Sequence, residues 1–252
     1  MDALELIRIQ VRRCEDECIR VLCCPEAILG GLADNLPHPS RFAIATDTDM
    51  LRHTLSPLAS DTVTNIVGFS ELGDGGRIYN SAVVFQRSEI AGLYRKLYPA
   101  IRRSVYSPGL EIPVFRIEEL SFGIVICNDS NYPELARLMA KQGASALFVP
   151  TNSGLPPKRA SAELIARARK RDIATAVENN MWVIRADVAG NAGGLVSFGL
   201  SGIVDPEGIV VQSARQMSED LVVADIDTIP RVRQRGKNTS PSHISTVHSG
   251  SD

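Results

Sequence analysis

The feature that most constrains this chain is a buried strand that runs directly into a cysteine. Residues Phe122–Ile126 form an uncharged apolar run with β-branched side chains, which is typical of a buried strand. Pro133 and the leucines after it predict an amphipathic helix that begins a few residues later. Cys127 therefore lies at the carboxyl end of a strand, where open α/β sheets bind their ligands. Its thiol is either a nucleophile facing a cleft or a small core hydrophobe, and its surroundings have to decide between the two.

Strands and helices alternate along the rest of the chain. Apolar residues recur at helical spacing over residues 3–20, and this helix leads into an apolar strand that ends on Pro25-Glu26. Further strands are predicted at residues 64–69, 81–85, 90–94, 114–117, 146–150, 181–186, 196–204, 208–213 and 221–226. Further helices are predicted at residues 46–59, 133–142 and 158–178. This pattern predicts an α/β fold, with a mixed sheet or with two sheets packed between helices.

The chain shows one domain and a polar tail. No internal repeat or midway linker divides residues 1–229, which we expect to fold as a unit. Residues 71–76 are polar and glycine-rich, and they predict a turn. Residues 230–252 are rich in Ser, Thr, Arg, Gly and His, so we expect a tail that is disordered or that orders against a second subunit.

Composition excludes several classes of partner. A formal charge of −2 gives no reason to expect nucleic acid or an anionic membrane surface. No apolar run approaches the roughly 18 residues of a membrane span, and the start lacks a signal-peptide pattern. Four of the five cysteines lie between Cys14 and Cys24 without the paired spacing of a zinc site. We therefore predict a cytoplasmic protein with reduced thiols, no metal and no cofactor.

A nucleophilic cysteine in this chain needs a base other than histidine. The four histidines, at positions 38, 53, 243 and 248, lie in loop, weakly structured or tail sequence. A carboxylate at a strand end is the alternative, and Glu26 directly follows a buried strand and a proline. Lys96 follows another strand, and an ammonium beside Cys127 would stabilise both a thiolate and an oxyanion. Taken singly, each residue is better explained by a structural role, Glu26 as a helix-capping acid and Lys96 as a solvated charge at a strand end.

Taken together, these residues resemble a known enzyme superfamily. The ordered motifs are Pro25-Glu26, Tyr94–Pro99, Gly123–Asp129 and Tyr132–Glu134, followed by residues 178–180, 199–202 and 205–208. Their order and spacing are similar to those of the carbon–nitrogen hydrolase (nitrilase) superfamily. The resemblance covers nearly all of residues 3–227.

The resemblance implies both a fold and a mechanism. The fold is an α-β-β-α sandwich with mixed sheets, which pairs with a second copy. At the matching positions, Glu26 would be the general base, Lys96 the oxyanion stabiliser and Cys127 the nucleophile. The backbone N–H of Asn128 would complete the oxyanion hole. The reaction would be hydrolysis of a non-peptide carbon–nitrogen bond through a thioester.

The chain departs from the family pattern in two places. The family normally opens with a strand before the first helix, whereas here Met1 lies at the predicted helix itself. Either the start of this sequence was chosen too late or that strand is missing. Many members carry a second glutamate about eight residues after the lysine, where this chain has Arg102 and Arg103. Glu111 and Glu134 are conceivable substitutes, but both read as structural acids.

The substrate is only loosely defined by the sequence. The branch that hydrolyses N-carbamoyl amino acids uses arginines to hold the carboxylate of its substrate. This chain has Ser130 and Asn131 at the positions of those arginines. We therefore expect a small amide, with a nitrile or a carbamoyl acid as alternatives. A catalytically impaired homologue that serves as a binding or structural subunit is the rival hypothesis. Asn131, Tyr132 and Asn152 either line the substrate pocket or hydrogen-bond the turns that carry them.

Overall fold

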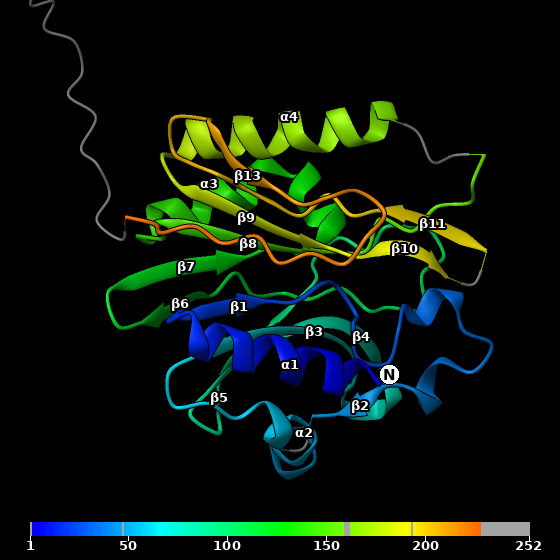
Figure 1. Ribbon diagram of the computed structural model, residues 1–252. Coiled ribbons are helices and arrows are strands. Elements are labelled where there is room, and N and C mark those ends of the chain that lie inside the picture. The colour runs from blue at the N-terminus through cyan, green and yellow to red at the C-terminus, as the bar shows by residue number, and fades with distance from the viewer. Residues whose placement is uncertain (1, 47, 159–161, 193, 228–252) are drawn as a thin grey trace, which may run out of the picture.

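Two β-sheets face each other between helices. The computed structural model describes residues 2–46, 48–158, 162–192 and 194–227. Figure 1 shows helices α3 and α4 on one outer side of the paired sheets and α1 and α2 on the other. The helices are α1 (Ala3–Asp16), α2 (Thr48–Leu55), α3 (Pro133–Lys141) and α4 (Ala162–Asn179). This arrangement confirms the predicted α/β class with mixed sheets. The predicted tail, residues 230–252, lies outside the described residues.

The first sheet, called sheet A, has the strand order β1-β3-β4-β5, with β2 paired to β3. Its strands are β1 (Val21–Cys23), β2 (Ile44–Ala45), β3 (Thr64–Leu72), β4 (Ile78–Gln86) and β5 (Glu89–Arg95). β1 runs parallel to β3, and the two hairpin pairs β3–β4 and β4–β5 are antiparallel. The carboxyl ends of β1 and β5 consequently lie at the same edge of sheet A.

The second sheet, called sheet B, has the strand order β13-β12-β9-β8-β7-β6. Its strands are β6 (Val114–Ile117), β7 (Leu120–Ile124), β8 (Ala146–Thr151), β9 (Trp182–Asp187), β12 (Gly202–Val204) and β13 (Val210–Ser213). The central strands β7, β8 and β9 are parallel to one another. Their carboxyl ends therefore share one edge, which is where ligands bind in parallel sheets.

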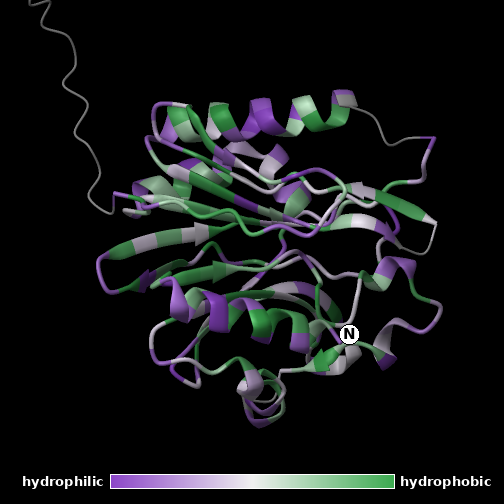
Figure 2. Ribbon diagram, in the orientation of Figure 1, coloured by the Kyte–Doolittle hydropathy of each residue, from purple (hydrophilic) through white to green (hydrophobic). Residues whose placement is uncertain are grey.

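Two apolar cores hold the layers together. One core packs α1 and α2 on sheet A through Val11, Leu55, Val67 and Phe85. The other joins both sheets and the second helix layer, and it includes Ile66, Val84, Phe122, Ile124, Leu135, Met139, Leu147 and Val183. Figure 2 shows apolar stretches along the strands in the middle of the molecule. Within the described ranges, no helix combines the length and the apolar character that crossing a membrane requires.

The structure corrects several element boundaries. α1 ends at Asp16 rather than at residue 20, because Cys18 takes a left-handed backbone conformation with φ 57°. The turn predicted at residues 71–76 begins later, since β3 extends to Leu72. Its polar Glu71 is fully buried because Arg95 and Ser81 satisfy its carboxylate. The polar Glu71 therefore belongs to a buried ion pair with Arg95 and does not mark the start of a turn.

Of two strand predictions after residue 195, one was wrong and the other was right only in part. Residues 221–226 form no strand, because their backbone is paired with no strand among the described residues. Val223 instead donates its N–H to the side chain of Gln212 at 2.9 Å. The strand predicted over residues 196–204 is two strands, β11 (Leu195–Phe198) and β12. β11 pairs with β10 (Ala189–Ala192), a strand that the sequence pattern did not indicate.

Candidate active site

Glu26 stands at the edge of sheet A that faces sheet B. The chain turns there directly above Gly68 of β3, where a Cβ atom would lie 2.4 Å from the Pro25 carbonyl oxygen and 2.9 Å from the Glu26 Cα. Only a residue without a side chain permits this approach. The Glu26 N–H donates to the Thr151 carbonyl at the end of β8, 3.3 Å away. The loop that carries Glu26 is thus attached to both sheets.

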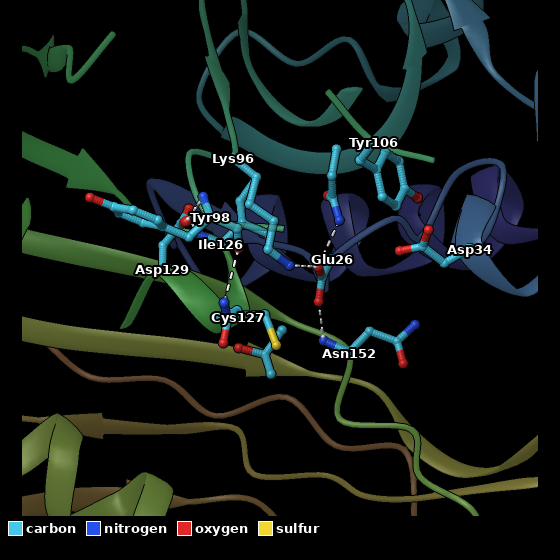
Figure 3. Close-up of polar contacts among 12 residues, drawn as sticks. Glu26, Asp34, Lys96, Tyr98, Tyr106, Ile126, Cys127, Asp129 and Asn152 are labelled. Carbon is cyan, nitrogen blue, oxygen red and sulfur yellow. Dashed lines mark hydrogen bonds and ion pairs between the residues drawn. The ribbon is translucent and has the colours of Figure 1, made fainter. Parts of the chain in front are cut away.

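The Glu26 carboxylate is buried and receives three hydrogen-bond donors. The residue is 2% exposed. Its Oε1 accepts from Lys96 Nζ at 2.5 Å and from Asn80 Nδ2 at 2.7 Å, and its Oε2 accepts from the Asn152 N–H at 2.9 Å. Figure 3 shows these donors arriving around the carboxylate from different parts of the chain. Such a set fixes the orientation of an ionised carboxylate in a site with little water.

Lys96 follows β5, at the same edge of sheet A as Glu26. Its backbone N–H donates to the Asn80 carbonyl at 2.8 Å, and its own carbonyl accepts from the Gly109 N–H at 2.8 Å. Burial lowers the pKa of the Lys96 ammonium, but the neighbouring Glu26 and Cys127 raise it more, so the net shift is upward. Lys96 is therefore a permanent cation in the site.

Cys127 begins a short 3₁₀ turn, Cys127–Asn131, at the carboxyl end of β7. Its φ of 46° is uncommon for a residue with a side chain and indicates a constrained turn. The buried carboxylate of Asp129 holds this turn, accepting from the Ile126 N–H at 3.1 Å, the Tyr98 N–H at 2.8 Å and the Tyr94 hydroxyl at 2.7 Å. The turn of sheet B that begins at Cys127 is thereby tied to the strand end that carries Lys96.

The thiol of Cys127 faces the Glu26–Lys96 pair (Figure 3). Burial, with a further contribution from the Glu26 carboxylate, raises the pKa of Cys127 to about 12, although Lys96 and Arg185 lower it. At neutral pH the resting group is therefore a thiol, beside a carboxylate that can accept its proton. The structure brings together the three predicted side chains, which come from three different strand ends.

The other predicted residues lie around this centre in different ways. Asn128 follows the cysteine within the first turn of the 3₁₀ segment, where backbone N–H groups lack partners inside the helix. Asn131 donates its side chain to Asn128 Oδ1 at 2.7 Å, and the Tyr132 ring stacks on Tyr98 at 3.6 Å. Asn152 contributes its backbone N–H to Glu26, and its side chain accepts from the Gly154 N–H at 3.3 Å. The side-chain contacts of Asn131, Tyr132 and Asn152 brace turns.

None of the positions considered for a second glutamate adds a buried acid. Arg102, Arg103, Glu111 and Glu134 are all exposed. Sequence reasoning missed Asn80, a 2% exposed amide within β4. A polar amide in the middle of an apolar strand was the available signal, since buried polar groups need a partner.

Comparison with known proteins agrees with this geometry. A family model described as carbon-nitrogen hydrolase matches residues 3–234. A nitrilase of Pyrococcus abyssi is 33% identical over 175 residues, which cover 69% of this chain and 63% of that protein. An (R)-stereoselective amidase of a Pseudomonas species is 29% identical, covering 85% of this chain and 76% of that protein. The alignments with the first three curated relatives span 63%, 59% and 63% of their lengths.

The fold is also found among solved structures. The crystal structure of a carbon–nitrogen hydrolase from Helicobacter pylori G27 superposes with a TM-score of 0.74 at 24% identity, covering 85% of this chain and 80% of that one. With a family model that matches most of its length, this chain belongs to the carbon–nitrogen hydrolase family.

Proposed function

We propose that this protein hydrolyses a non-peptide carbon–nitrogen bond of a small amide, with Cys127 as the nucleophile. The observation that carries the proposal is the buried Glu26–Lys96 pair, which faces the Cys127 thiol. A purely structural ion pair has no need of a thiol that faces it at the carboxyl end of a sheet strand. The family membership and the amidase-named relative support the same reaction class.

The first half of the proposed reaction forms a thioester. Glu26 takes the proton from the Cys127 thiol as the sulfur attacks the carbonyl carbon of the amide. The carbonyl oxygen becomes an oxyanion between the Lys96 ammonium and the Asn128 N–H. Collapse of this tetrahedral intermediate breaks the carbon–nitrogen bond. Glu26 returns the proton to the nitrogen, and ammonia or an amine leaves.

The second half hydrolyses the thioester. Glu26 takes a proton from a water molecule, and the resulting hydroxide attacks the thioester carbon. The same two donors stabilise the second oxyanion. The carbon–sulfur bond then breaks, the carboxylic acid departs, and the proton on Glu26 restores the thiol. The enzyme returns to its initial state without a cofactor.

A nitrile is the second candidate substrate, because the Pyrococcus abyssi relative is named a nitrilase. An N-carbamoyl amino acid is less favoured, since Ser130 and Asn131 offer no guanidinium for its carboxylate.

We further propose a cytoplasmic protein, which the free state of all five cysteines supports. Self-association through the α3–α4 layer is supported by the exposed Leu138 and Leu164, at 42% and 39%.

Thiol labelling and product release test the proposal together. Although the resting Cys127 is a thiol, we expect iodoacetamide to modify it faster than the exposed Cys18, because Glu26 takes its proton during attack and Lys96 stabilises the thiolate. Lys96→Ala should abolish that difference. A screen of short aliphatic amides and nitriles for ammonia release then defines the substrate. Glu26→Gln and Cys127→Ala should each lower kcat at least a hundredfold, whereas Cys18→Ser should not. Ordinary labelling of Cys127 together with no ammonia release would favour the impaired homologue.

A further inference from the structure

A second buried cation lies behind the nucleophile, and nothing in the sequence motifs accounts for it. Arg185 is 3% exposed, within β9 in the centre of sheet B. Its Nε and Nη2 donate to the two carboxylate oxygens of Asp172 on α4, at 2.8 Å and 2.5 Å. Asp172 is itself 2% exposed. This two-pronged pair fixes the plane of the guanidinium against the inner side of α4.

The other contacts of the guanidinium lead to the active site along two routes. Nη1 donates to Thr151 Oγ1 at 2.7 Å, and the carbonyl of Thr151 accepts the Glu26 N–H. The residue after Thr151 supplies the N–H that binds the Glu26 carboxylate. The first route therefore ends on the general base.

The second route ends on the nucleophile. Nη2 lies 3.4 Å from Ser130 Oγ, at the long end of the hydrogen-bond range. The Ser130 hydroxyl donates to the Cys127 carbonyl at 2.7 Å. One rigid guanidinium thus joins the loop that positions Glu26 to the strained turn that presents Cys127.

We propose that Arg185 is a positioning residue, which holds the base loop and the nucleophile turn at their working separation and adds a second positive charge behind the sulfur. The catalytic part of this inference rests on the function proposed above, whereas its effect on the thiol does not. Arg185 lowers the pKa of the Cys127 thiol, as Lys96 does from the other side. Burial alone would lower the pKa of Arg185, but Asp172 reverses that shift, so the guanidinium stays charged.

Charged groups surround the Cys127 thiol on the strand ends, the turn and the helix that pack around it. The charged groups are Glu26 after β1, Lys96 after β5, Asp129 in the nucleophile turn, Arg171 and Asp172 on α4, and Arg185 and Asp187 on β9. Glu26 and Asp187 raise the pKa of the thiol, and Lys96 and Arg185 lower it. Removal of Arg185 leaves Lys96 as the one cation among these four to oppose two carboxylates.

The test measures the rate of iodoacetamide labelling of Cys127 against pH in four variants of the full chain. Arg185→Gln removes the charge, and we expect labelling at pH 7 to slow about tenfold, because loss of the cation raises the pKa of the Cys127 thiol. Arg185→Lys keeps the charge but not the fork, so its labelling profile should stay within threefold of wild type while kcat falls at least tenfold. Ser130→Ala should lower kcat with little change in KM or in the labelling profile.

Arg169→Gln is the matched control. Arg169 lies on α4 with Asp172, and its Nη1 is 3.8 Å from Asp172 Oδ2. Its guanidinium donates to the carbonyls of Leu200 and Ser201 rather than to the site. We expect its labelling profile and kcat to match wild type. A folded Arg185→Gln protein with a control-like labelling profile and an unchanged kcat would overturn the proposal.

Two further outcomes are informative. If Arg185→Gln does not fold, Ser130→Ala and Thr151→Val carry the positioning test, because both leave the Arg185–Asp172 pair intact. An unchanged kcat in both would refute the positioning role. If the wild-type protein hydrolyses no amide or nitrile, the proposed function fails, while the labelling profiles of Arg185→Gln and Arg185→Lys still decide the charge effect.

Discussion

At the scale of single residues, the orientation of Glu26 depends on donors that differ in strength. Lys96 contributes a charge, whereas Asn80 contributes a neutral amide N–H and Asn152 a backbone N–H. Asn80 also keeps one oxygen, Oδ1, buried without a partner. A buried polar atom of this kind costs free energy, so Asn80 contributes less to stability than a fully hydrogen-bonded amide would.

Asn80→Ala should therefore lower kcat clearly while changing the free energy of unfolding little. The variant loses one donor to the Glu26 carboxylate, and we expect kcat to fall about tenfold with a smaller change in KM. Asn65→Ala is the control, since Asn65 is also a buried amide in sheet A with an unpartnered Oδ1. Its Nδ2 donates to the Leu58 carbonyl and not to the site. Equal losses of kcat in both variants, measured by steady-state kinetics, would count against a role for Asn80.

A second prediction at the residue scale concerns the pH dependence of stability that Asp129 causes. Burial raises the pKa of this carboxyl from its ordinary value of 3.8 to about 6, although Tyr94 and two backbone N–H groups oppose the shift. A folded-state pKa above the unfolded value means that the native state binds the proton more tightly. The contribution of Asp129 to stability is therefore greatest below about pH 4 and is lost as the pH rises through 6.

The comparison with Asp129→Asn isolates this contribution. Between pH 4 and pH 7 the free energy of unfolding of wild type, relative to the variant, should fall by up to about 3 kcal/mol. Urea unfolding at several pH values measures it. A constant difference across that window would show that the carboxyl does not titrate as described.

At the scale of secondary-structure elements, periodicity predicted most helices and strands but few of their ends. α3 was predicted at residues 133–142 and runs from Pro133 to Lys141, because a proline start and an amphipathic face are local properties. Residues 221–226 have the composition of a strand, but a strand also needs a neighbour to accept its hydrogen bonds. Composition carries no information about that neighbour.

The contact between β3 and the Glu26 loop gives an element-scale prediction. In Gly68→Ala the new methyl group meets the backbone of Pro25 and Glu26, which cannot move without displacing the carboxylate. We expect activity to fall at least tenfold and the free energy of unfolding to fall by about 1–3 kcal/mol. Gly92→Ala is the control, since its methyl group would meet the Phe115 ring instead. Activity per folded molecule should be retained in that variant.

At the scale of the whole molecule, the site exists because the edges of two sheets meet. Sheet A supplies the Glu26 carboxylate and the Lys96 ammonium, and sheet B supplies the Cys127 sulfur and the N–H of Asn152 (Figure 3). The outer face of the α3–α4 layer carries exposed leucines that a second copy would cover.

Self-association should accordingly depend on that layer. Light scattering after size exclusion should show a smaller particle for the double variant Leu138→Ser with Leu164→Ser than for wild type. The matched control is Ile209→Ser with Val211→Ser at the β13 edge, where the side chains are 62% and 43% exposed. If only the control pair dissociates the particle, the interface lies on β13 instead.

The sequence by itself determined which chemistry was possible. A cysteine after a buried strand, an acid after another and a lysine after a third are local facts, as is the absence of a suitably placed histidine. The tertiary structure decided which groups meet. The partners of Glu26 are 54, 70 and 126 positions away along the chain, and the pairing of Arg185 with Asp172 joins a strand to a helix. Such contacts depend on how sheets and helices pack against each other, which no local pattern of residues encodes.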